Sequence, residues 1–170
     1  MALDPNSSER DRRLRAGVRV GAVVSLFHEE LTGAMLASAR RELVAAGMLE
    51  DGMRVVWVPG AFELPLVARR LAKRTDIDAV LCFGLVLKGE TSHDLYVATA
   101  AANGILQAGM ETDKPVLFGV LTCDNMEQAQ SRALPPDQGG VEDKGREVAR
   151  AAIDVLAALD DVDGRTRSDS

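Results

Sequence analysis

The residues with the clearest chemical potential lie in one stretch, positions 84–93 (GLVLKGETSH), where an apolar run enters a glycine turn and then a helical pattern. The helical pattern opens with His93, one of only two histidines in the chain. A helix N-terminus carries unpaired backbone N–H groups and partial positive charge, so it can bind a phosphate. A histidine titrates near neutral pH and can transfer protons beside that phosphate. The stretch therefore predicts chemistry on a small phosphorylated molecule.

Other side chains that could contact a ligand also follow apolar runs. Phe27 ends the first run, where its ring could stack on a flat heterocycle or simply pack in the core. Phe62 and Glu63 follow a turn at 59–61, so a carboxylate stands where the next helix begins; the helix dipole alone is a sufficient reason for an acid there. His28, between Phe27 and two glutamates, is interpreted as an exposed loop residue.

A phosphate also needs a positive partner, and Arg132 and Lys144 are the candidates. Both lie in helical patterns, where such charges are ordinarily solvated. The turn at 88–93 itself offers only Lys88, whose side chain could point away from the anion.

Composition limits the classes of protein that this chain could belong to. It has 170 residues, of which 46% are apolar and 27% charged, which suits one globular domain with a sizeable core. The net charge of −6 argues against a nucleic-acid or membrane-surface partner. No apolar run approaches a membrane span and residues 1–8 lack a hydrophobic signal core, so we expect a cytoplasmic protein.

The ends of the chain and its cysteines carry no chemistry in this interpretation. We expect a flexible, solvated arm over residues 1–15, an α/β domain over 16–160 and a flexible tail over 161–170. Cys82 and Cys123 lie in apolar runs without the spacing of a metal or redox site. They are predicted to be small buried hydrophobes, and no metal site is expected.

The elements that must position these residues alternate between strands and helices. Apolar runs predict strands at 18–25, 55–58, 78–87 and 115–121. Helical spacing of apolar residues predicts helices over about 31–44, 64–71, 96–108, 125–133 and 144–159. Strands that are apolar on both faces and alternate with amphipathic helices indicate a parallel sheet covered on both sides. The predicted fold class is therefore α/β, a three-layer α/β/α sandwich around a central, mostly parallel four-stranded sheet.

Ligands of such sheets bind beyond the carboxyl ends of the strands, where the strand order switches. The loops that follow the predicted strands would meet at that edge. The chain has neither a GxGxxG fingerprint nor a Walker-type Gly-Lys-Ser/Thr, so the pattern alone names no reaction.

Four strings occur in the order 58–65 (VPGAFELP), 89–97 (GETSHDLYV), 115–122 (PVLFGVLT) and 125–132 (NMEQAQSR). Together they resemble the lumazine synthase family, and the resemblance runs from about residue 18 to 159. It implies a flavodoxin-like fold and the penultimate step of riboflavin biosynthesis. In that step, 5-amino-6-(D-ribitylamino)uracil and 3,4-dihydroxy-2-butanone 4-phosphate condense to 6,7-dimethyl-8-ribityllumazine, phosphate and water. The family uses no metal and no organic cofactor.

Carried over position by position, the resemblance implies a role for each matching residue. His93 would be the catalytic acid and base. The N–H groups of Glu90 and Thr91 would bind the phosphate together with Arg132. Glu147 would form a charged pair with Lys144 in the last helix. The residues that would contact the pyrimidine and its ribityl chain are Phe27, Ala61, Phe62, Glu63, Leu85, Val86, Leu87, Phe118 and Lys144.

The resemblance also implies an assembly. In the family each pocket lies between two subunits of a pentamer, so Phe118, Arg132 and Lys144 would come from a neighbouring subunit. The loop at 133–143 is longer than in members that build sixty-subunit shells. An extended loop goes with free pentamers or pentamer pairs, so we expect a homo-oligomer of that kind and no icosahedral shell.

Two other classes of function remain as alternatives. One is a relative that binds flavin or lumazine without turnover, or serves as a scaffold; the joint presence of Glu63, His93 and Arg132 argues against it, because a pure binder needs no phosphate site. The other is a generic flavodoxin-like nucleotide or signalling domain. The missing phosphate fingerprint and the missing acidic receiver cluster make that class a poor fit.

Overall fold

Four parallel strands form the sheet of the computed structural model, which describes residues 13–165. They are β1 (Val20–Ser25), β2 (Met53–Val58), β3 (Ala79–Leu87) and β4 (Val116–Cys123). The strand order is β2-β1-β3-β4, and every pair is parallel. The predicted four-stranded parallel sheet is confirmed.

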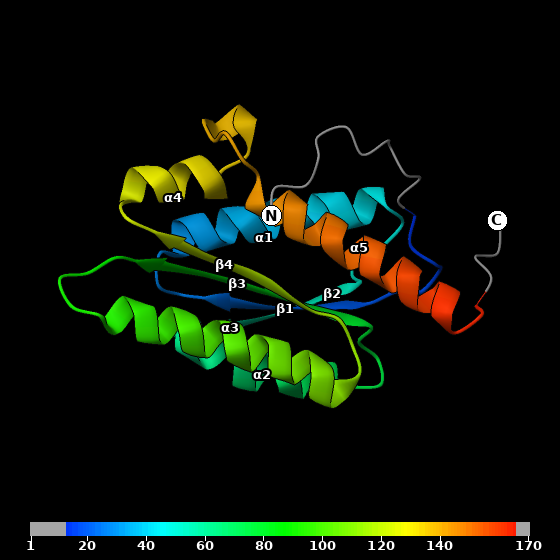
Figure 1. Ribbon diagram of the computed structural model, residues 1–170. Coiled ribbons are helices and arrows are strands. Elements are labelled where there is room, and N and C mark those ends of the chain that lie inside the picture. The colour runs from blue at the N-terminus through cyan, green and yellow to red at the C-terminus, as the bar shows by residue number, and fades with distance from the viewer. Residues whose placement is uncertain (1–12, 166–170) are drawn as a thin grey trace.

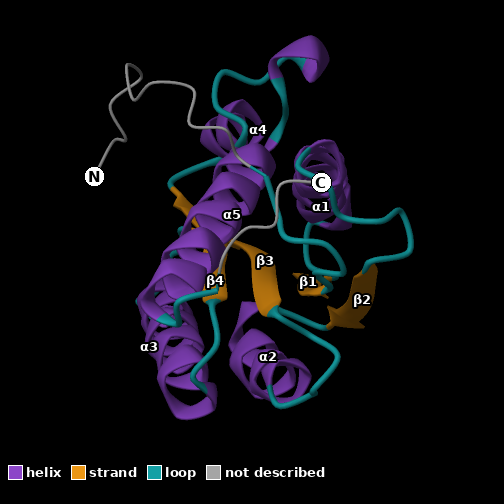
Figure 2. Cartoon of the chain, turned by 90° about the vertical axis from the view of Figure 1, so that its right-hand side faces the viewer, coloured by secondary structure: helices purple, strands orange, loops and turns teal. Residues whose placement is uncertain are grey.

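Helices cover both faces of this sheet (Figures 1 and 2). One face carries α1 (Glu29–Ala45), α4 (Met126–Ala133) and α5 (Lys144–Val162), and the other carries α2 (Leu64–Ala72) and α3 (His93–Thr112). Two short 3₁₀ turns, η1 (Ala61–Glu63) and η2 (Pro136–Gln138), precede α2 and α5. The predicted three-layer sandwich is therefore the observed fold.

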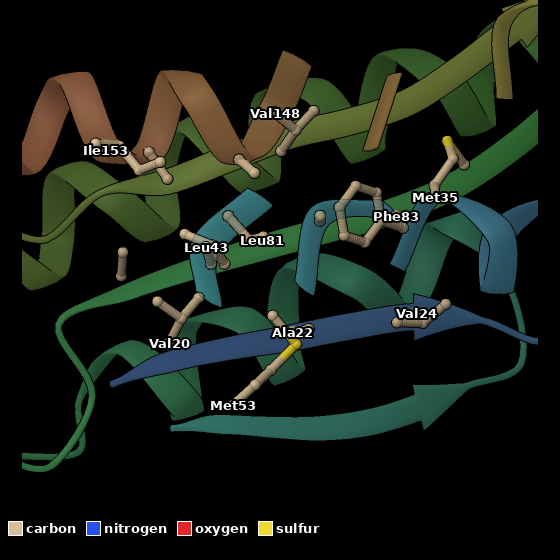
Figure 3. Packing of buried hydrophobic residues seen from close by; sticks show 14 of the residues in the cluster. Val20, Ala22, Val24, Met35, Leu43, Met53, Leu81, Phe83, Val148 and Ile153 are labelled. Atoms are coloured by element: carbon tan, nitrogen blue, oxygen red, sulfur yellow. The ribbon is translucent and has the colours of Figure 1, made fainter. Parts of the chain in front are cut away.

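Strand β3 is apolar throughout because helices cover both of its faces. Leu81 and Phe83 are fully buried toward the α1, α4 and α5 layer, where Figure 3 shows them among the packed side chains of that layer. Val80 and Cys82 are equally buried toward α2 and α3. β3 lies between β1 and β4 in a parallel sheet, and an inner strand of such a sheet is covered by helices on both faces.

Pairing extends some strands beyond the apolar runs that predicted them. β2 begins at Met53, which pairs with Val20 of β1. β4 continues to Cys123, which pairs with Leu87 at the end of β3. Hydrogen bonds to a neighbouring strand, which a single run of residues does not reveal, set these ends.

Residues 1–12 of the predicted arm and residues 166–170 of the predicted tail lie outside the described residues. Inside them, the N–H of Leu14 donates to the carbonyl of Ala46 at 2.8 Å. Helix α5 also continues past the predicted end of the domain, to Val162.

Arg15 is anchored, and the prediction that it is solvated is wrong. Its Nη2 donates to Oδ1 of Asp78 at 2.5 Å, and its Nε lies 3.4 Å from Oδ1 of Asp160. The two carboxylates come from distant parts of the chain and meet only in the folded protein.

Helices α1 and α5 touch at Gly145. A Cβ atom at this position would lie 2.1 Å from the carbonyl oxygen of Met35. The preceding Asp143 caps α5 by accepting from the N–H of Arg146 at 3.0 Å, and its other carboxylate oxygen accepts from Oγ of Ser38 at 2.6 Å. The end of the 134–143 loop is thus bound to α1.

We expect Gly145→Ala to destabilise the protein by about 1–3 kcal/mol, because the added methyl group meets backbone that cannot rotate away. Gly33→Ala in α1 is the matched control. Its Cβ would meet only the Trp57 ring at 3.8 Å, and alanine favours a helix by about 1 kcal/mol over glycine. Chemical denaturation at equal protein concentration measures both variants. Equal unfolding midpoints for the two would contradict the close contact.

Candidate active site at the carboxyl edge of the sheet

The carboxyl ends of the four strands lie at one edge of the sheet, on the left in Figure 1. The chain runs from β1 outward to β2 and then crosses to β3 on the other side of β1, so the strand order switches between β1 and β3. Phe27 lies two residues beyond β1, and the loop at 88–92 follows β3. Both therefore flank the position where parallel sheets bind their ligands.

His93 is the first residue of α3, and its side chain is exposed. Its backbone N–H lies 3.4 Å from Oγ1 of Thr91. Glu90 and Thr91 are exposed in the preceding loop, and within residues 13–165 their own N–H groups donate no hydrogen bond. The loop thus offers free donors beside a titratable ring, an arrangement suited to an anion.

The turn after β2 contributes a second group of predicted residues. The ring of Phe62 is 62% exposed, whereas Ala61 is buried and can present only backbone to a ligand. Oε2 of Glu63 accepts from the N–H of Gly60 at 3.0 Å, which holds the carboxylate at the turn. Because η1 packs against α3, this turn lies on the same side of the sheet as the helix that begins with His93.

The end of β3 forms the floor between these loops. Leu85 is buried in the core, and Val86 and Leu87 are half-buried. The N–H of Lys88 still donates to the carbonyl of Cys123 at 2.9 Å, so the ladder extends one residue past the strand. The side chain of Leu85 packs toward α1, α4 and α5, so its backbone is the part available to a ligand.

Phe118 does not join this group within one chain. It lies in the middle of β4, opposite Cys82, and its ring is 45% exposed at the edge of the sheet. Cys123 at the carboxyl end of β4 is five residues further on, or about 17 Å along the strand.

Arg132, Lys144 and Glu147 also lie apart from His93. They belong to α4 and α5, on the opposite face of the sheet from α3 (Figure 1). Nη1 of Arg132 donates to the carbonyl of Gln128 at 3.2 Å, and Nζ of Lys144 lies 2.7 Å from Oε2 of Glu147. One chain therefore brings together the loop residues around His93 and leaves four predicted residues elsewhere.

A hollow of about 300 Å³ beside the 88–92 loop places further side chains next to the predicted residues Val86 and Lys88. It lies between the first turns of α3 and the ends of β3 and β4, and Nζ of Lys88 is 3.9 Å from Oδ1 of Asp124 there. The lining residues are Val86, Lys88, Asp94, Leu95, Ala98, Thr122, Cys123 and Asp124. Lys88 and Asp124 directly follow two paired strands, in loops that the sequence predicted to meet at this edge.

His28 differs from its predicted role as an exposed loop residue. It is half-buried, precedes α1, and has φ 60° and ψ 46°, in the left-handed region. The centroids of the His28 and Phe27 rings are 5.8 Å apart. Left-handed backbone is most often signalled by glycine, and the sequence has none at this turn.

The two cysteines are buried, as predicted. Burial raises the pKa of the Cys82 thiol and of the Cys123 thiol, so both stay protonated at neutral pH and are poor nucleophiles. Among residues 13–165, no cluster of three or more His, Cys, Asp or Glu side chains could hold a metal ion. None of the helices described is long and apolar enough to cross a membrane.

Fold and site together define an α/β protein whose candidate ligand site lies at the carboxyl edge of a parallel sheet. The model of the 6,7-dimethyl-8-ribityllumazine synthase family matches residues 17–160. A 6,7-dimethyl-8-ribityllumazine synthase of Thermus thermophilus is 44% identical over 144 residues, which cover 85% of this chain and 89% of the relative. The enzyme of the same name from Protochlamydia amoebophila is 40% identical, covering 84% and 80%.

The chain belongs to the 6,7-dimethyl-8-ribityllumazine synthase family. The family resemblance stated from the four strings of residues is confirmed, and the match covers the whole sheet and all of its helices except the last two residues of α5.

Proposed function

We propose that this chain condenses 5-amino-6-(D-ribitylamino)uracil with 3,4-dihydroxy-2-butanone 4-phosphate to 6,7-dimethyl-8-ribityllumazine, releasing phosphate and water. The observation that carries the proposal is the family match over residues 17–160, which includes every loop of the candidate edge. The exposed aromatic rings, free N–H groups and histidine at that edge suit a flat, polyhydroxylated substrate and a phosphorylated one.

His93 is the proton carrier in this proposal. Imine formation, phosphate elimination and ring closure each move a proton, and the exposed imidazole at the mouth of the site can both donate and accept one. Most of the remaining acceleration comes from holding the two substrates in register.

The phosphate binds the 88–92 loop in this proposal. The N–H groups of Glu90 and Thr91 have no hydrogen-bond acceptor among the described residues, and the phosphate would supply one. Lys88 is the cation nearest in sequence, but its Nζ lies 3.9 Å from the carboxylate of Asp124, so a second cation would strengthen phosphate binding. Arg132 supplies that cation, and an open hollow beside it, lined also by Asn125 and Gln128, leaves its side chain accessible.

The pyrimidine lies between Phe27 and the end of β3. Phe27 stacks on the ring, Phe62 and Glu63 hold the ribityl chain, and the backbone of residues 85–87 contacts the ring edge. Phe27 and Phe62 are 69% and 62% exposed, which is a large apolar area to leave in water without a partner.

Each site takes Phe118, Arg132, Lys144 and Glu147 from a neighbouring subunit. Two different surfaces of the chain must then meet, one bearing His93 and the other bearing Arg132. Such a head-to-tail contact closes into a ring when its rotation allows closure. We therefore favour a ring of identical chains, a pentamer or a pair of pentamers.

Exposed apolar side chains on α3 support burial by a second copy of the chain. Tyr96, Leu106 and Met110 are 71%, 67% and 78% exposed. Leu106 and Met110 are four residues apart and share one face of the helix. Monomers rarely leave such a row of large side chains in water.

Purified protein mixed with the two substrates should form product with the absorbance and fluorescence of a lumazine. His93→Ala should lower kcat by up to about 10²–10⁴-fold, because proton transfer is lost while both substrates still bind. Asp161→Ala, exposed in the last turn of α5 away from the candidate edge, is the control and should retain full activity.

No product above the uncatalysed background from the unaltered chain would contradict the enzymatic proposal and favour a binding protein. Full activity of His93→Ala would agree with the proposed reaction but contradict the role of His93 as its proton carrier.

Light scattering should give the mass of a pentamer or a pentamer pair of 18.2 kDa chains. The long 134–143 loop, with η2 in its middle and its end bound to α1 through Asp143, fixes the approach to α5. A mass corresponding to an icosahedral shell would contradict the expected effect of this loop.

A further inference from the structure

His28 has a backbone conformation that its position does not explain. Within residues 13–165, it is one of two residues other than glycine with positive φ, and the second, Asp113, ends α3, where left-handed backbone is common. His28 instead precedes the first turn of α1, where residues usually have extended backbone. Its side chain makes no capping hydrogen bond, so capping does not account for the conformation.

The imidazole of His28 contacts the ring of Phe27. The two centroids are 5.8 Å apart and the ring planes meet at 71°, the edge-to-face geometry that aromatic pairs favour. The Phe27 ring is otherwise 69% exposed. His28 therefore supports one side of a ring that has little other packing.

Hydrogen bonds fix the backbone on both sides of Phe27. Its N–H donates to the carbonyl of Pro59 at 3.2 Å, and its carbonyl accepts from Oγ of Ser25 at 3.3 Å. Oγ1 of the buried Thr32 donates to the carbonyl of Ser25 at 2.8 Å, which ties this turn to α1. With the backbone fixed, the remaining freedom of Phe27 is rotation about the two torsions of its side chain.

We propose that His28 is a positioning residue that holds the Phe27 ring in the orientation in which it stacks on the pyrimidine substrate. The inference rests on the proposed function and adds a specificity element to the same site. The backbone strain at His28 is maintained because it brings the imidazole against the ring. His28 acts through Phe27 and does not itself touch the reacting atoms.

The test measures kcat and KM for the pyrimidine in His28→Gly, Phe27→Leu and the double variant. Glycine accepts positive φ, so His28→Gly removes the ring without adding backbone strain. An edge-to-face pair predicts a rise of about threefold to tenfold in KM for the pyrimidine, with kcat changed by less than about twofold. The KM for the phosphate substrate should not change.

The double variant distinguishes positioning from direct contact. In the Phe27→Leu background, His28→Gly should have no further effect on kcat/KM for the pyrimidine, because the ring that it positions is gone. Equal effects of His28→Gly in both backgrounds would overturn the proposal, and so would an unchanged pyrimidine KM in the single variant.

His28→Asn is the second variant, since asparagine also tolerates left-handed backbone and lacks the aromatic ring. It should reproduce the KM rise of His28→Gly. Normal affinity in His28→Asn would show that backbone shape alone matters and would contradict the role of the ring. Failure of the proposed function is distinguishable, because it leaves the unaltered chain without product.

Discussion

The parallel pairing of β3 with both β1 and β4 is the constraint on which the rest of the structure depends. It requires a strand that is apolar on both faces, and the buried residues of β3 satisfy that requirement. It also brings every strand to the same edge at its carboxyl end. Phe27, the η1 turn and the 88–92 loop lie at one edge for this reason and not because they are close in sequence.

The same pairing separates the predicted site into two parts. The connection from β3 to β4 runs through α3 on one face of the sheet, so the helix that begins with His93 lies there. No strand follows β4 among the described residues, and α4 and α5 pack on the opposite face with Arg132 and Lys144. Two neighbouring chains can bring together surfaces that lie on opposite faces of one sheet, which is the physical reason for proposing a shared site.

The sequence predicts those features that depend on local pattern. Two-sided burial of residues 79–87 and the glycine turn before His93 are visible in single runs of residues, and the sheet, its layers and the loop edge follow from them. Features made by contacts between distant residues are not visible in the same way. Arg15 meets Asp78 and Asp160 only in the folded chain. From the sequence alone, the charged residues around it predicted a solvated arm.

The turn at His28 shows a second limit of prediction from sequence. Hydrogen bonds from Ser25 and Thr32 and to Pro59 hold the backbone just before it, and no residue type at the turn predicts its left-handed conformation. Phe118 shows a third, because its motif matches the family while its position, about 17 Å along β4 from the carboxyl edge, excludes it from a site within one chain.

Mixing two impaired variants tests the shared site most directly. His93→Ala and Arg132→Ala chains are unfolded together, refolded as mixed oligomers and assayed at a low concentration of the phosphate substrate. If each site takes His93 from one chain and Arg132 from its neighbour, about one quarter of the sites in an equal mixture are intact, and activity returns to roughly that fraction. Activity no higher than the average of the two variants refolded separately would contradict the account, because it would mean that both residues act within one chain.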